Sequence, residues 1–117
     1  MVNFYKWTAS NEQLFGLDLA KARDLVVECF YTAQKDKFQA LKEKAGIPSS
    51  EKDVYDSITV MVRLAFVEVE GDFQQPTKEK LLKVVDFLNA REVMWGTPRD
   101  VVEHNKAQML KVVNKLR

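Results

Sequence analysis

The sequence predicts an all-α protein, and three observations lead to this prediction. Four stretches of the chain carry apolar side chains at spacings of three and four residues, which is the period of an amphipathic helix. Helix-capping residues stand at several of their ends. Only 4 glycines and 3 prolines occur among 117 residues, so the elements between turns are long. We expect one domain over residues 1–117, a four-helix bundle of the up-and-down type with an aromatic N-terminal segment across one end.

The N-terminal segment is rich in aromatic residues and ends in a possible helix start. Ser10 and Gln13 have the spacing of a capping box, so a short helix is expected there, or else an early start of the first long helix. A strand over residues 2–7 is the alternative, although no partner strand is evident. The aromatic side chains are those of Phe4, Tyr5, Trp7 and Phe15.

The first long helix is expected over about residues 18–45. After Lys37 its apolar positions shift to Phe38, Leu41 and Ala45, which predicts a bend or packing on a different neighbour. Gly46 is the expected stop, and Pro48 prevents continuation. The main apolar face before the shift carries Leu19, Ala22, Val26, Cys29, Phe30 and Ala33.

The second helix is expected to begin at Ser50, with Asp53 three residues later, and to end at Gly71. It is apolar on nearly every side, which is typical of a helix at the centre of a bundle or at an interface. A strand over residues 66–70, where apolar and acidic residues alternate, is the alternative.

Two further helices are expected over about residues 77–94 and 97–117. Thr97 has the position of an N-cap and Pro98 that of the first helical residue. Asn105 falls in the middle of the apolar stripe of the last helix. The stripe consists of Val101, Val102, Met109, Val112, Val113 and Leu116.

Charge and composition exclude several classes of function. With 18 basic and 17 acidic residues the net charge is +1, which argues against nucleic-acid binding. No uncharged run exceeds six residues, so no membrane span is expected. The N-terminus does not resemble a secretory signal, and a cytoplasmic location is therefore expected.

The chain lacks the residue patterns of most enzymes, metal sites and cofactor sites. The single cysteine, Cys29, lies on an apolar helix face and is expected in the core. One histidine cannot supply the pair of Glu-x-x-His motifs of a di-iron bundle. No glycine-rich phosphate loop is present. We therefore expect no cofactor, no metal and a function that does not involve catalysis.

Arg99 and His104 form the one pattern with a catalytic alternative. Their spacing resembles the R-x(4–6)-H motif of the HEPN superfamily, although Asn105 and Lys106 replace the tyrosine that commonly follows the histidine. The resemblance implies an all-helical domain that cleaves or binds RNA. Histidine would move a proton, and arginine would stabilise the developing phosphorane charge.

Arg63 is the only charge between Ser57 and Val67. It is expected either in a thin solvent-facing stripe with Asp56, Thr59 and Glu70, or as the ligand-binding residue of a pocket between the second and fourth helices. The second alternative would make the protein a small-molecule binder.

Asn105, Ala107 and Leu110 suggest a second face on the last helix. A polar residue inside an apolar stripe needs a partner for its amide and can fix an oligomeric state. Leu110 points away from the main stripe, on the side of Ala107. Together with the apolar second helix, these residues predict a protein–protein interaction module that acts as a homodimer.

Overall fold

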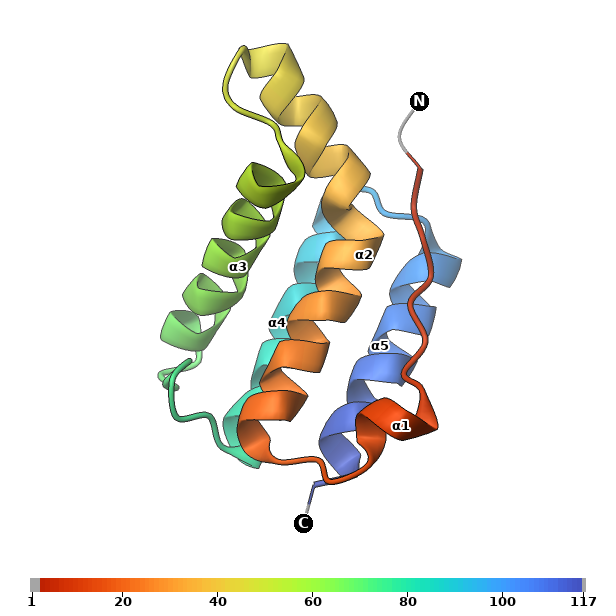
Figure 1. Ribbon diagram of the computed structural model, residues 1–117, viewed down its shortest axis with the longest axis vertical. Helices are drawn as coiled ribbons and strands as arrows, with labels where there is room; N and C mark the ends of the chain where they lie inside the picture. Colours follow the sequence, from red (N-terminus) through yellow and green to blue (C-terminus); the bar gives the residue numbers. More distant parts are fainter. Residues whose placement is uncertain (1–2, 117) are drawn as a thin grey trace.

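The computed structural model describes residues 3–116, and within that range it contains helices and no strands. Figure 1 shows the long helices packed as a bundle, with a short helix ahead of them. The helices are α1 (Asn11–Leu14), α2 (Leu19–Ala45), α3 (Glu51–Glu68), α4 (Lys78–Met94) and α5 (Arg99–Asn114). The all-α bundle is confirmed, and the alternative strand over residues 66–70 is wrong because α3 extends into that range.

Each long helix packs against the next one along the chain, and α5 also packs against α2. The interior is apolar, with Phe30, Phe66, Leu88 and Met109 at most 1% exposed. The up-and-down order of the bundle stays a prediction. Within residues 3–116, none of the helices is both long and apolar enough to cross a lipid bilayer.

Several predicted helix ends are confirmed by their hydrogen bonds. Ser10 and Ser50 each form a capping box, with Gln13 and Asp53 respectively. Gly46 ends α2 with a left-handed φ of 70°. Such a φ disfavours a side chain, which explains why glycine stands there.

The expected cap of α3, Gly71, lies two residues too late, because Val69 is the C-cap. The helix stops at Glu68, because Glu70 takes a left-handed φ of 57° and the Gly71 amide donates back to the Phe66 carbonyl oxygen at 2.8 Å. A Cβ on Gly71 would lie 3.1 Å from the Cβ of Lys80, so α4 approaches closely at this point.

The prediction that Thr97 caps the last helix is wrong. Pro98 is the N-cap, without a side-chain capping bond, and α5 begins at Arg99. The side chain of Thr97 is instead buried, and its Oγ1 accepts a hydrogen bond from Nε2 of Gln34 at 3.2 Å. The Thr97 hydroxyl is therefore bonded to a residue of α2 and does not cap α5.

The end of α2 projects beyond the bundle, as Figure 1 shows. Phe38 packs against Trp95, with ring centroids 5.6 Å apart, and Phe30 of the main apolar face contacts the same Trp95 at 5.9 Å. The shift therefore does not bring Phe38 to a different neighbour. Leu41 and Ala45 are both exposed, so they do not continue this packing.

The N-terminal segment runs along α5 and not across one end of the bundle (Figure 1). The Ala9 amide donates to Oε1 of Gln108 at 3.0 Å, and Lys6 forms an ion pair with Asp100 at 3.1 Å. Trp7 is 8% exposed and anchors the segment in the core. No strand forms over residues 3–7.

Candidate functional site

The outer face of α3 exposes apolar side chains to solvent. Val60, Leu64 and Val67 follow one another at spacings of four and three residues, and they are 53%, 50% and 67% exposed. The opposite face of the helix is buried and carries Val54, Ile58, Val62, Ala65 and Phe66. The helix is therefore apolar both toward the bundle and toward solvent. We call Val60, Leu64 and Val67 the α3 stripe.

One edge of the α3 stripe carries an acid and a base. Asp56 and Arg63 are both exposed and lie seven residues apart. Seven residues make almost two helical turns, so the two side chains stand in line along the helix. Asp56 also pairs with Lys52 at 2.7 Å, in an exposed contact one turn earlier.

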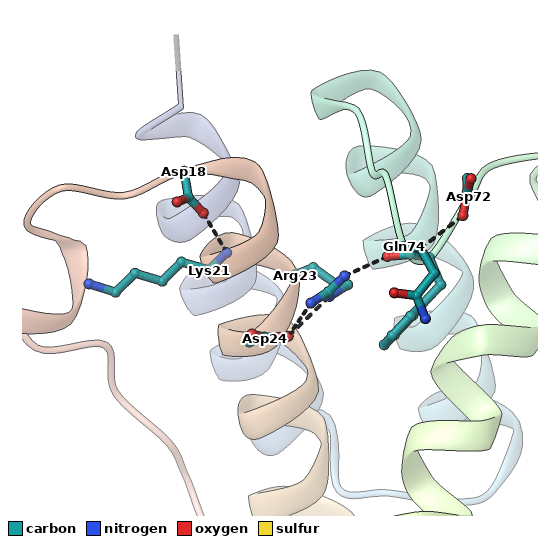
Figure 2. Close-up of polar contacts among 7 residues, drawn as sticks. Asp18, Lys21, Arg23, Asp24, Asp72 and Gln74 are labelled. Atoms are coloured by element: carbon teal, nitrogen blue, oxygen red, sulfur yellow. Dashed lines mark hydrogen bonds and ion pairs between the residues drawn. The ribbon is translucent and has the colours of Figure 1, made fainter.

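Arg63 also contacts the loop between α3 and α4. Its guanidinium carbon lies 4.2 Å from the ring centroid of Phe73, and that of Arg23 lies 4.5 Å from the same centroid. Nη1 of Arg23 donates to the Phe73 carbonyl oxygen at 2.7 Å. Figure 2 shows Arg23 directed at this loop with Asp24 beside it. The two arginines thus hold the loop against α2 and α3. Ligand binding by Arg63 stays a prediction.

A group of polar side chains lies inside the bundle. Glu92 of α4 is 0% exposed, and its Oε2 accepts hydrogen bonds from Gln34 and Asn105, both at 2.8 Å. Its Oε1 accepts a bond from Asn89 at 2.9 Å. Thr97 joins the group through its bond from Gln34. We call these five residues the Glu92 cluster.

The Glu92 carboxyl group has amide partners but no cation. None of the ion pairs within residues 3–116 includes it. Burial raises the pKa of Glu92, and the hydrogen bonds from the three amides only partly oppose this effect. Two buried acceptors in the cluster, Oε1 of Gln34 and Oδ1 of Asn89, have no hydrogen-bond partner in the described part of the chain.

Cys29 lies next to the Glu92 cluster. Its Sγ is 3.8 Å from Oδ1 of Asn105. Burial, followed by the nearby charge of Glu92, raises the pKa of the Cys29 thiol. A thiol in this state is a poor nucleophile, in keeping with the core position expected from the sequence.

Asn105, Ala107 and Leu110 do not share one surface. Asn105 is 0% exposed and its amide bonds to Glu92, so the partner that its position required lies within the chain. Leu110 is half-buried against the core, and Ala107 is exposed. An interface through these three residues stays a prediction.

Arg99 and His104 each have a different partner. Nε of Arg99 donates to Oε1 of Glu103 at 3.0 Å, and the Arg99 side chain is 91% exposed. Nε2 of His104 lies 2.7 Å from the Trp7 carbonyl oxygen. A carbonyl oxygen only accepts, so Nε2 carries the proton and helps to hold the N-terminal segment. Cleavage of RNA by this pair stays a prediction.

Among residues 3–116, no group of three or more His, Cys, Asp and Glu side chains is placed to hold a metal ion. Comparison of the chain with protein-family models, with curated proteins and with solved structures finds no match. Its function is therefore inferred from the α3 stripe and the Glu92 cluster.

Proposed function

We propose that this protein is a protein–protein interaction module that pairs with a second copy of itself through the α3 stripe. The observation that carries the proposal is the exposure of Val60, Leu64 and Val67 on one face of a helix. Apolar side chains gathered on an outer face are typical of surfaces that bind another protein. A two-fold dimer would remove the same face of both copies from water.

The charges beside the stripe favour a second copy as the occupant. When two identical helices pack antiparallel about a two-fold axis, the same edge of each helix meets its equivalent. With the two-fold axis level with Val60, Asp56 of each copy lies opposite Arg63 of the other, which gives two reciprocal ion pairs. The two Val60 side chains meet at the axis, and Leu64 and Val67 of each copy cover the N-terminal half of the other α3. These pairs contribute to register and orientation more than to affinity, because exposed ion pairs are weak.

Cys29 supports a cytoplasmic location, which is part of this proposal. The chain has one cysteine and so forms no intrachain disulfide, and the structure places this residue in the interior. Proteins of oxidising compartments commonly contain disulfides, whereas cytoplasmic proteins keep their thiols reduced.

Sedimentation equilibrium tests the dimer with a matched pair of variants. The wild type should sediment at twice the 13.5 kDa of one chain. Leu64→Lys should raise the dissociation constant roughly 100-fold, since two copies each lose about 1.5 kcal/mol of apolar burial. Leu41→Lys, at the similarly exposed end of α2, should leave the dimer intact. A wild-type monomer at high concentration would overturn the proposal.

A charge exchange tests the antiparallel arrangement separately. Asp56→Arg places like charges opposite each other and should weaken the dimer. Adding Arg63→Asp to the same chain restores opposite charges and should restore most of the affinity. If the double variant dissociates as readily as the single one, the copies do not meet along this edge.

A further inference from the structure

A groove of about 480 Å³ lies between α4 and α5, away from the α3 stripe. Its apolar lining consists of Ala90, Val93 and Val102. Asn89 and Thr97, two members of the Glu92 cluster, also line it. The groove therefore joins the protein surface to the polar interior of the bundle.

Asn89 and Thr97 give the deepest part of the groove a hydrogen-bonding character. They are only 7% and 6% exposed, and Oδ1 of Asn89 is an acceptor without a partner in the described residues. The Thr97 hydroxyl accepts a bond from Gln34, which leaves its own hydrogen to donate. One acceptor and one donor thus belong to two residues that line the same groove.

The rim of the groove is balanced in charge. Two acids, Asp86 and Glu103, stand there with two bases, Arg99 and Lys106. All four are exposed, and Arg99 already pairs with Glu103. Such a rim gives no net attraction to either an anion or a cation, which favours an uncharged ligand.

We propose that this groove binds a neutral small molecule through a carboxamide-type group. Oδ1 of Asn89 is buried in the unliganded structure, so on binding the Asn89 side chain rotates to present this oxygen to the N–H of the ligand. The C=O of the ligand accepts from the Thr97 hydroxyl. The apolar part of the ligand packs between Val93 and Val102.

Three probes of one shape and different charge test this proposal: benzamide, benzoate and benzamidinium. Each is titrated into ¹⁵N-labelled protein while the backbone amide signals are followed. Benzamide should shift the signals of Asn89, Val93, Thr97 and Val102 with a dissociation constant on the order of 1 mM, as expected for a small fragment. The two charged probes should bind at least tenfold more weakly. Equal shifts by all three probes, or no shift by benzamide up to its solubility limit, would overturn the proposal.

Two tryptophan variants locate the binding. Val93→Trp fills the groove, and because Val93 is 65% exposed the change leaves the core intact. It should abolish the benzamide shifts. Met94→Trp is the control, since Met94 is 69% exposed and does not line the groove. Benzamide binding that survives Val93→Trp would refute the site. These measurements do not depend on whether the chain forms a dimer.

Discussion

Replacing Glu92 with glutamine should change how the stability of the protein depends on pH. Glu92 is completely buried, has three amide donors and has no cation partner within residues 3–116. Its pKa in the folded chain is raised above the value in the unfolded chain, with burial as the main cause. Glu92→Gln keeps the size and most of the hydrogen-bonding capacity of the side chain but does not titrate.

The sign and size of the effect follow from proton binding. Below about pH 4.5, the ordinary pKa of glutamate, Glu92 is protonated in both the folded and the unfolded chain. In this range Glu92 makes its full contribution to the free energy of unfolding. As the pH rises, the unfolded chain releases this proton first, whereas the folded chain keeps it until its raised pKa is passed. The free energy of unfolding of the wild type therefore falls relative to Glu92→Gln by about 1.4 kcal/mol per pH unit in that window.

Urea unfolding of both proteins at a series of pH values measures this difference. Asp53 and Asp100 have lowered pKa values, but they are present in both proteins and their contributions cancel. The separation between the two stability curves should grow from about pH 4.5 upward and become constant above the folded pKa of Glu92. Curves that stay parallel over the whole range would refute a raised pKa for Glu92.

Three further predictions concern single contacts. His104→Ala removes the bond to the Trp7 carbonyl oxygen and should lower the free energy of unfolding by about 1 kcal/mol. It should also accelerate hydrogen exchange in residues 3–9, and unchanged exchange would show that other contacts hold the segment. Arg23→Ala should lower the free energy of unfolding by about 1–2 kcal/mol in urea titrations. Arg23→Lys should recover only part of this loss, because lysine lacks the planar guanidinium that lies over Phe73. Cys29 should react with iodoacetamide no faster than the chain unfolds, as mass spectrometry over time would show, and rapid labelling of folded protein would contradict its burial.

Helix starts that depend on neighbouring residues could be predicted from the sequence. The Ser10 and Ser50 capping boxes involve residues only three positions apart, so local chemistry decides them. Thr97 has an equally good local pattern, yet its hydroxyl bonds to Gln34, 63 residues earlier in the chain. A helix end that touches the interior is decided by partners that a local pattern does not contain.

One signal for the buried cluster was present in the sequence and was missed. Glu92 continues the spacing of Leu81, Val85 and Leu88, so it occupies an apolar position of its helix. Gln34 stands four residues after Phe30 and Asn89 four residues after Val85, so both also occupy apolar positions of their helices. That their amides meet one carboxyl group depends on how α2, α4 and α5 pack together, which periodicity within a single helix does not determine.

The α3 stripe and the Glu92 cluster together reverse the usual distribution of residues. A leucine at position 92 and polar residues on the outer face of α3 would be the ordinary choices for an isolated bundle. The two departures lie on different elements, since the cluster joins α2, α4, α5 and the turn before α5, whereas the stripe belongs to α3. Hydrogen bonds have a defined direction, so they specify the packing of α2, α4 and α5 more narrowly than apolar contacts do. Leu64→Lys should consequently weaken association without lowering the stability of the monomer, whereas Glu92→Leu should lower that stability, because three buried amide donors lose their acceptor.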